Sequence, residues 1–360
     1  MTRLGILGGG QLAQMLALAA IPLDVRCAFL DPSPEACAGA AGELIVGAYD
    51  DPDGLDRLAA ASDVVTYEFE SVPAASAARL EAGAMVRPGS AALEVAQDRL
   101  SEKRLFTRLE IETPDFWPVD SQWDLDGVPL PVVLKTRRLG YDGKGQRVLH
   151  TWDEVAGAFE SLGGVPLIAE QLITFDRELS VVAVRGADGA VACYPVVENR
   201  HEGGILRTTL APAPGLDPEL VARAESYAQR LLEELGYVGV LALELFADGD
   251  RLLANEIAPR VHNSGHWTID GAVTSQFENH VRAVLGLPLG ATEAVADSAM
   301  VNLIGGAPST DALAAFPGAH LHLYGKAPRP GRKIGHVTLV GDQALQQLDE
   351  VELLVESHAA

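Results

Sequence analysis

The 360-residue sequence has little cysteine and no long hydrophobic run, and these absences exclude two classes of protein. Three cysteines without a C-x-x-C spacing indicate neither a disulfide framework nor a zinc site. No stretch approaches the roughly 20 unbroken apolar residues that a membrane span needs. The first residues, MTRLGILGG, are typical of a β-strand and not of a signal peptide, so we expect a cytoplasmic protein that binds no membrane.

Positive charge is also scarce, with 27 Lys and Arg residues against 50 Asp and Glu residues, a net charge of −23. Such a chain repels nucleic acid and anionic membrane surfaces, because neither supplies the opposite charge. If the protein binds phosphate groups, it must use local basic clusters and backbone N–H groups. The few basic segments therefore become the candidates for ligand sites.

The first of the glycine-rich segments is GILGGGQLAQMLA, in which Gly8, Gly10 and Ala13 form a G-x-G-x-x-A pattern, with Asp31 further on. This is a near match to the dinucleotide-binding fingerprint, although the pattern alone is weak. Apolar runs of strand length alternate with helical segments in the first 90 or so residues. This part of the chain therefore predicts βαβ units and a parallel sheet. From about residue 130 hairpin signals favour antiparallel pairing.

The second glycine-rich segment is KTRRLGYDGKGQ, in which Lys135 precedes Gly140, Gly143 and Gly145. A loop of this kind can fold its N–H groups over phosphate oxygens while lysines supply positive charge. The Walker A pattern G-x-x-x-x-G-K-[ST] is absent, and an ordinary basic hairpin remains an alternative.

Glu244 and Glu256 lie on the two arms of a predicted hairpin, ALELFADGDRLLANEI. They share a face of the sheet if the loop between the arms has an odd number of residues. Two carboxylates near nucleotide phosphates suit Mg²⁺, which keeps water in its other positions. The alternative is a pair of solvated glutamates, but apolar neighbours such as Leu243 and Ile257 suggest buried strands.

Two more polar segments follow. NEIAPRVHNSGH places Arg260, His262, Asn263 and His266 directly after the second carboxylate, a density that favours a functional loop. KAPRPGRKIGH gathers basic residues in a turn of an acidic protein, which indicates either an anion site or a solvated loop.

Together these segments resemble the ATP-grasp enzymes, and most closely the 5-(carboxyamino)imidazole ribonucleotide synthetase family of purine biosynthesis. The resemblance covers nearly the whole chain and is carried by GGGQL, YEFESVP, QDRLSEKRLF, KTRRLGYDGKGQ, EQLITFDRELS, GYVGVLALELF, NEIAPRVHNSGHW, SQFENH and LYGKAPRPGRKIGH. It implies an α/β fold (α+β overall) in three parts: a Rossmann-like domain at 1–95, an ATP-grasp region at 96–290 with a lid at about 115–175, and a small C-terminal β domain at 291–360 that completes the substrate site.

The resemblance also implies a reaction. The family uses ATP and bicarbonate to carboxylate the amine of 5-aminoimidazole ribonucleotide, by way of carboxyphosphate, and releases ADP and phosphate. Mg²⁺ would be bound by Glu244 and Glu256, and the protein would be a homodimer. Residues implied in ATP binding are Arg99, Lys103, Lys135, the loop Gly140, Tyr141, Asp142, Gly143, Lys144, Gly145 and Gln146, the strand edge Glu170, Gln171, Leu172 and Ile173, and Glu178, His201, Asn255 and Glu256.

The implied catalytic residues form two groups. Arg260, His262 and Lys333 would surround bicarbonate or the leaving phosphate, and Tyr141, Asp142 and Lys144 would close on the amine. Either Asp142 or the released phosphate would take the proton of the amine. The implied contacts to the nucleotide substrate are the glycine turn at Gly10, Gln11 and Leu12, with Glu68, Asn263, Lys326, Arg332 and Lys333. One departure is that the usual GGGQLGRM reads GGGQLAQM here, with Ala13 and Gln14 replacing Gly and Arg.

Two alternatives remain. One is another ATP-grasp enzyme, such as the formate-dependent glycinamide ribonucleotide transformylase, which NEIAPRVHNSGHW and RPGRKIGH argue against. The other is a nicotinamide-dependent oxidoreductase built on the first βαβ unit. That reading leaves the second glycine loop and the pair of glutamates without a function.

Overall fold

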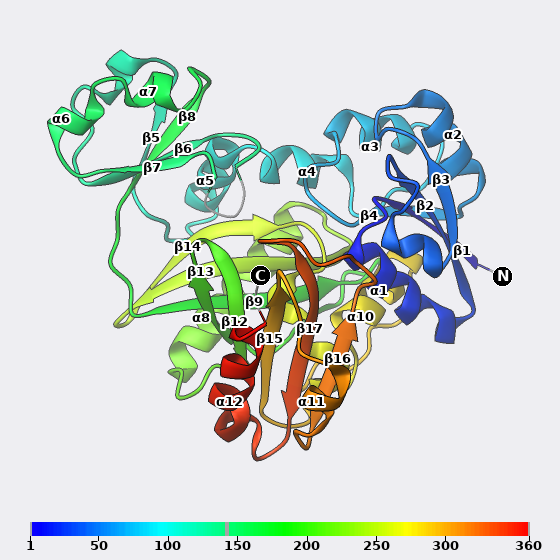
Figure 1. The fold of residues 1–360 in the computed structure, drawn as a ribbon. Helices are drawn as coiled ribbons and strands as arrows, with labels where there is room; N and C mark the ends of the chain where they lie inside the picture. Colours follow the sequence, from blue (N-terminus) through cyan, green and yellow to red (C-terminus); the bar gives the residue numbers. More distant parts are fainter. Residues whose placement is uncertain (1, 141–143, 359–360) are drawn as a thin grey trace.

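The computed structural model describes residues 2–140 and 144–358, and in this part of the chain the strands form three sheets (Figure 1). No helix in these residues is long and apolar enough to cross a membrane. The predicted α/β class is confirmed, because one sheet is parallel and two are antiparallel.

The N-terminal sheet is parallel and has the strand order β3-β2-β1-β4. Its strands are almost wholly apolar because helices cover them, and Leu4, Ile6 and Phe29 are fully buried. The strands are β1 (Thr2–Leu7), β2 (Val25–Asp31), β3 (Glu43–Val46) and β4 (Val64–Tyr67), and the helices are α1 (Gln11–Ala20), η1 (Ile21–Leu23), η2 (Cys37–Ala40), α2 (Pro52–Ala60), α3 (Ala74–Glu81) and α4 (Ser90–Ala96).

The second sheet lies apart from the rest of the molecule, at the upper left of Figure 1, and has the antiparallel order β5-β8-β6-β7. It has its own small core, including Val119, Leu134 and Leu167. Helix α5 (Arg99–Arg108) precedes it in the chain. Its elements are β5 (Phe116–Val119), η3 (Gln122–Leu125), β6 (Val132–Thr136), β7 (Gln146–Leu149), α6 (Trp152–Val155), α7 (Ala158–Ser161) and β8 (Leu167–Gln171).

The third sheet has nine strands in the order β14-β13-β9-β11-β12-β15-β17-β16, with β10 paired to β9. Its strands are β9 (Arg177–Arg185), β10 (Val191–Cys193), β11 (Val197–Glu202), β12 (Ile205–Ala211), β13 (Gly239–Asp248), β14 (Arg251–Ala258), β15 (Ser298–Ile304), β16 (Ala319–Leu323) and β17 (Lys333–Val340). Its helices are α8 (Pro218–Glu234), η4 (Asn263–Gly265), α9 (Thr268–Gly271), α10 (Gln276–Leu285), α11 (Thr310–Ala314) and α12 (Ala344–Glu356).

The strands of the expected C-terminal domain belong to this third sheet. β12 pairs with β15 in an antiparallel register that places Thr209 opposite Met300, and both residues are fully buried. The segment 291–360 therefore extends the sheet that carries the nucleotide-binding candidates, instead of forming a sheet of its own.

A buried histidine joins the N-terminal sheet to the third sheet. His280 of α10 lies within hydrogen-bonding distance of Thr66 Oγ1 of β4 (2.9 Å from Nε2) and accepts from the Val240 N–H of β13 at Nδ1 (3.1 Å). Since Nδ1 accepts, the ring hydrogen is on Nε2 and is donated to Thr66. Burial lowers the pKa of His280 to about 3, so this link uses the neutral ring.

Candidate active site

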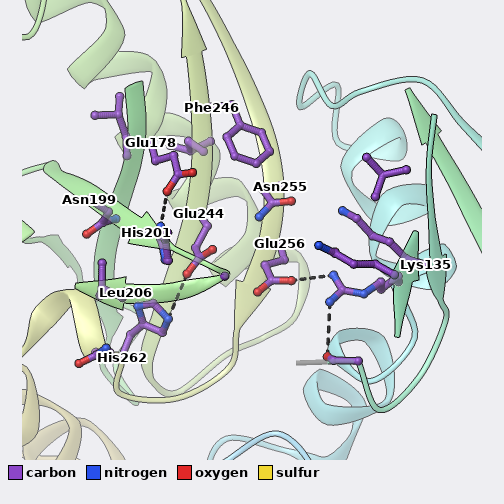
Figure 2. Close-up of a pocket in the computed structure, with 18 of the residues that line it drawn as sticks. Lys135, Glu178, Asn199, His201, Leu206, Glu244, Phe246, Asn255, Glu256 and His262 are labelled. Carbon is purple, nitrogen blue, oxygen red and sulfur yellow. Dashed lines mark hydrogen bonds and ion pairs between the residues drawn. The ribbon is translucent and has the colours of Figure 1, made fainter. Parts of the chain in front are cut away.

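A cavity of about 650 Å³ opens between the three sheets, and Figure 2 shows part of its lining. Gln11, Phe69 and Glu70 come from the N-terminal part, Lys135 and Glu170 from the second sheet, and Glu178, Glu244 and Glu256 from the third. Lys333, at the start of β17, also lines it. The cavity therefore joins residues that are more than 300 positions apart in the sequence, such as Gln11 and Lys333.

Glu244 and Glu256 lie directly opposite each other on β13 and β14. The turn that joins these strands has two residues, Gly249 and Asp250, which is not the odd number that a shared face requires of a regular hairpin. A β-bulge in β14 supplies one extra residue and so brings both glutamates to the same face. Leu245 pairs with Ala254 and Glu244 with Glu256, so Asn255 is the extra residue in β14. Consequently Asn255 and Glu256 both line the cavity although they are adjacent in the chain.

Each glutamate of this pair contacts a cationic or titratable side chain (Figure 2). Glu244 Oε1 lies 3.2 Å from His262 Nε2. Burial alone would raise the pKa of Glu244, but the hydrogen bond from His262 and the combined electrostatic effect of His262, His201 and Arg260 outweigh it and lower this pKa to about 2. Glu256 Oε2 lies 2.7 Å from Arg99 NH1, and the other terminal nitrogen of Arg99 faces the Gly140 carbonyl at 3.5 Å. Arg99 therefore bridges the glycine-rich loop and the carboxylate pair.

Glu170, on β8 of the second sheet, also lines the cavity. Its Oε2 is 3.0 Å from Lys135 Nζ and 3.5 Å from Lys103 Nζ. Burial raises the pKa of Glu170, but the two ammonium groups outweigh it and bring this pKa to about 2. The carboxylate is thus ionised and holds Lys135 at the cavity wall.

The strand edge after Glu170 offers fewer groups than expected. The N–H of Gln171 donates to the Asp115 carbonyl (2.8 Å) and the N–H of Leu172 to the Pro131 carbonyl (3.1 Å). A ligand must therefore use the strand carbonyls or Ile173. Beside this edge the rings of Phe175 and Phe246 stack with centroids 4.5 Å apart at 18°. They form an apolar wall suited to a flat ring.

Glu178 and His201 form an ion pair in the cavity lining, on the neighbouring strands β9 and β11 (Figure 2). Burial lowers the pKa of His201, but the Glu178 carboxylate outweighs it and the pKa is raised. Asn199 lies beside them and donates to Ser180 Oγ (2.6 Å). Both expected residues therefore reach the cavity, with Asn199 as an additional lining residue.

Lys103 differs from the expectation that it contacts ATP or lines its cleft. It is 1% exposed, and its Nζ donates to Thr113 Oγ1 (2.9 Å) and to the carbonyls of Ala254 (3.1 Å) and Asn255 (2.8 Å). These contacts use its three donors behind strand β14, away from the cavity surface.

Arg260 and Glu70 form an ion pair at the other end of the cavity. Burial raises the pKa of Glu70, but Arg260 outweighs it and lowers this pKa to about 2. His262 Nδ1 lies 2.8 Å from Ser264 Oγ, which fixes the ring while Nε2 faces Glu244. Asn263 and Lys333 line the same region.

The N-terminal glycine turn differs from a phosphate-binding turn. The Glu68 carboxylate accepts from the N–H groups of Gly10 (2.5 Å) and Ala13 (2.8 Å) at the start of α1. The Asp31 carboxylate accepts from Gly9 N–H (2.9 Å). A phosphate at this helix terminus would meet two carboxylates, which does not suit an anion, and the implied contact of Gly10 with the nucleotide substrate stays a prediction.

The next residues of α1 do reach the cavity. Gln11 and Leu12 line it, and Lys326 Nζ donates to Gln11 Oε1. Arg332 donates instead to the Ala327 carbonyl (3.2 Å), and neither Arg332 nor Lys326 is itself among the lining residues.

The glycine-rich loop is described only in part. Gly140, Lys144 and Gln146 line the cavity, and Gly145 has a φ of +72°, a conformation that favours glycine. Tyr141, Asp142 and Gly143 lie outside the described residues.

Sequence reasoning missed several lining residues. Glu70 is the second acid of YEFE and follows strand β4, so its place at the carboxyl end of a parallel strand was a usable signal. Phe175, Phe246 and Asn199 carried no comparable signal, because Phe175 lies in the segment between β8 and β9, and a single aromatic or amide residue in a strand does not reveal which face it occupies. His266 was singled out by its motif and lines the cavity, although it is 1% exposed.

A glycine-rich loop on one antiparallel sheet facing paired carboxylates on another defines a class of protein. Residues 104–277 match the model of the ATP-grasp domain, residues 1–97 that of the ribonucleotide synthetase preATP-grasp domain, and residues 298–350 that of the phosphoribosylaminoimidazole carboxylase C-terminal domain. The class is therefore that of the ATP-grasp ligases.

The relatives narrow this class. The chain is 52% identical to N5-carboxyaminoimidazole ribonucleotide synthase of Pseudomonas aeruginosa, over 99% of this chain and 100% of the relative, and 47% identical to that of Brucella melitensis, over 94% and 96%. The crystal structure of the synthetase from Thermus thermophilus superimposes with a TM-score of 0.94 at 56% identity, over 99% of this chain and 98% of the other. The synthase of Aspergillus clavatus in complex with ADP and 5-aminoimidazole ribonucleotide superimposes with a TM-score of 0.91 at 29% identity, over 99% of both chains.

The chain belongs to the N5-carboxyaminoimidazole ribonucleotide synthase family, which confirms the expected family. It is an ATP-dependent ligase of purine biosynthesis. The alternatives of a formate-dependent transformylase and a nicotinamide-dependent oxidoreductase are therefore set aside.

Proposed function

We propose that this enzyme uses Mg-ATP and bicarbonate to carboxylate the exocyclic amine of 5-aminoimidazole ribonucleotide in the cavity described above. The observation that carries the proposal is the meeting of Lys135, the Glu244 and Glu256 pair, and the Arg260 and His262 pair around one space. Lys135 and the two glutamates suit a nucleoside triphosphate with its metal. Arg260 and His262 suit a small anion beside the terminal phosphate.

The nucleotide would lie between the second and third sheets. Its base fits the apolar wall of Phe175 and Phe246, and the ribose hydroxyls can donate to the Glu178 carboxylate. Lys135, with Lys144 of the loop, supplies positive charge to the phosphates. Arg99 would have to exchange Glu256 for a phosphate oxygen when ATP binds.

Glu244 and Glu256 suit a divalent cation because both are acceptors on one face of the sheet and Glu244 is ionised. Bound there, Mg²⁺ would neutralise charge on the phosphates during transfer. Within the described residues no group of three His, Cys, Asp or Glu forms a complete metal site. Two carboxylates nevertheless suffice for Mg²⁺, because water and phosphate oxygens fill its other positions.

The proposed reaction has two steps. An oxygen of bicarbonate attacks the γ-phosphorus and the bond to ADP breaks, which gives ADP and carboxyphosphate. The carbon–oxygen bond of carboxyphosphate then breaks, releasing phosphate and CO₂, and the amine nitrogen forms a bond to that carbon. The amine loses one proton, to the released phosphate or to Asp142. Arg260, His262 and Lys333 hold the anions, and positioning is their main contribution.

The imidazole ribonucleotide would enter from the N-terminal side. Because Glu68 and Asp31 already occupy the N–H groups of the glycine turn, the substrate phosphate would rely on Lys326, with Gln11 beside it. Asn263, next to His262 in the same loop, also lines the cavity and would contact this substrate.

The decisive experiment measures ADP release with Mg-ATP and bicarbonate, with and without 5-aminoimidazole ribonucleotide. We expect release that requires the ribonucleotide and falls by about 10²-fold or more in Glu256→Gln. ATP turnover that ignores this ribonucleotide but responds to another amine would overturn the substrate. No ATP turnover would overturn the proposal entirely.

The homodimer and the cytoplasmic location implied by the family resemblance are also proposals. Sedimentation equilibrium would test the first, with a mass of 76 kDa expected from two chains of 38.0 kDa. Cell fractionation would test the second.

A further inference from the structure

The bulge at Asn255 is the feature that brings Asn255 and Glu256 to the cavity together. Regular alternation along β14 would place them on opposite faces of the sheet. An extra residue disrupts the ladder locally and leaves backbone groups that need other partners. Strand β14 is also the edge of the third sheet, so its outer side has no neighbouring strand in the described part of that sheet.

The backbone groups around the bulge are held by helix α5 and the segment after it. Lys103 Nζ donates to the carbonyls of Ala254 (3.1 Å) and Asn255 (2.8 Å). Its neighbour Glu102 accepts from the Ile257 N–H at 2.6 Å. Thr113 Oγ1 adds a second donor to the Ala254 carbonyl, at 2.8 Å.

These contacts enclose the bulge on both sides along the chain. Glu102 and Lys103 are 2% and 1% exposed, although an ionic residue is rarely buried to this degree without a specific partner. Replacing the Lys103 ammonium with an apolar group would leave the Asn255 carbonyl without this donor. The strand would then be free to return to regular pairing, and the direction of the Glu256 side chain would change.

We propose that Lys103, with Glu102 and Thr113, is a positioning residue for the metal site. It holds the bulge so that Glu256 faces Glu244, and it acts on Mg-ATP through the backbone of β14 without touching the ligand. This inference rests on the proposed function, because it takes Glu244 and Glu256 as the carboxylates that bind the cation.

The test measures the equilibrium dissociation constant of ATP in EDTA and in excess Mg²⁺. The constant in EDTA divided by the constant in Mg²⁺ gives the factor by which the metal strengthens binding. We expect Lys103→Met to reduce this ratio on the order of tenfold, as supporting contacts around metal ligands commonly do. Lys103→Arg, which keeps the donors, should recover part of the loss. Lys103 is also 3.5 Å from Glu170, but losing positive charge there would weaken the binding of free ATP at least as much as that of Mg-ATP, because free ATP carries more negative charge, and so would not lower the ratio.

Arg230→Met is the matched control. Arg230 also donates to loop carbonyls, those of Leu109 (2.6 Å) and Glu110 (3.4 Å), but it lies outside the cavity lining. We expect its ratio to equal that of the wild type. If Lys103→Met does not fold, Thr113→Val removes one donor to the bulge and should lower the ratio by about threefold, with a normal unfolding temperature. That figure corresponds to a hydrogen bond worth roughly 0.7 kcal/mol.

Glu256→Gln separates the two possible failures. If it lowers the ratio while neither Lys103→Met nor Thr113→Val does, this inference is wrong and the proposed metal site stands. If Glu256→Gln itself leaves the ratio unchanged, the carboxylates do not bind the cation and both are overturned.

Discussion

The molecule contains two glycine-rich turns with opposite electrostatic surroundings. In the N-terminal turn, the backbone N–H groups of Gly9, Gly10 and Ala13 are taken by the carboxylates of Asp31 and Glu68. The loop that begins at Gly140 is flanked by Lys135 and Lys144, and both line the cavity opposite the glutamates of the third sheet. The same residue type therefore serves one turn whose N–H groups are taken by carboxylates and one that faces the proposed phosphate site. The side chains around a glycine turn decide what it binds.

Removing the positive charge beside the second loop should have the largest effect. We expect Lys135→Met to lower kcat/KM for ATP by roughly 10²–10³-fold, because a buried, oriented ammonium stabilises the phosphates most where water is excluded. Steady-state ADP release would measure it. Arg147→Met, in the same sheet but outside the cavity lining, is the control and should change kcat/KM less than about twofold. Equal losses in both variants would mean that the sheet as a whole was disturbed.

The next prediction concerns the substrate side of the first turn. Because its N–H groups are occupied, Lys326 should supply the charge for the substrate phosphate. We expect Lys326→Met to raise KM for 5-aminoimidazole ribonucleotide by about 10–100-fold, with KM for ATP unchanged. The neighbouring exposed Arg329 provides the control variant, Arg329→Met. A normal KM in Lys326→Met would contradict this prediction and would indicate that the N-terminus of α1 binds the substrate phosphate instead.

Acid should destabilise the junction between the N-terminal and third sheets, where His280 lies, more than the second sheet. The pKa of His280 is about 3 when folded and about 6.5 when unfolded, so the unfolded chain binds more protons between these values. The stability that this histidine provides is therefore complete above pH 6.5 and is lost as pH falls toward 3, by about 1.4 kcal/mol per pH unit. The second sheet carries only the exposed His150 in its described residues.

Hydrogen exchange at pH 7 and pH 5 would measure this difference. We expect amides of β4 and α10 to lose protection at pH 5 more than amides of β6 and β8, and His280→Gln to reduce that contrast. A uniform loss across all of these strands would contradict the prediction.

The smallest effect is expected at Glu68. Glu68→Gln keeps the size of the side chain but turns an amide N–H₂ toward one of two backbone N–H groups. We expect a loss of about 1–2 kcal/mol in the free energy of unfolding, measured by urea titration. NADH should bind neither variant nor wild type in a fluorescence titration. Micromolar NADH binding to Glu68→Gln would show that the first turn is a dinucleotide site blocked by one carboxylate.

The sequence predicted those parts of the molecule that depend on local pattern. The apolar run VRCAFLD became strand β2, and the hairpin with Glu244 and Glu256 was located correctly. Its register was not predictable, because the bulge at Asn255 depends on contacts from a helix about 150 residues earlier. Lys103 shows the same limit. The family resemblance placed it among the ATP-binding residues, and only the tertiary fold shows that its side chain is buried against the backbone of β14.

The two acidic residues of YEFE show a further limit. A carboxylate after a parallel strand is a usable signal for a site, but the pattern does not say which acid caps a helix and which enters the cavity. Glu68 points to the N-terminus of α1, and Glu70 pairs with Arg260. The choice follows from the direction of the chain after β4, which is set by packing.

The pairing of β12 with β15 has a consequence for how the chain can be divided. The match to the C-terminal family model begins at residue 298, where β15 also begins, so a truncation just before it would appear natural. Such a cut would remove the neighbour of β12 and expose a row of unpaired backbone groups along residues 208–211. An open edge of this kind recruits other strands. The shortened protein should therefore aggregate during expression. The last 60 or so residues cover an edge of the sheet that would otherwise pair with strands of other chains.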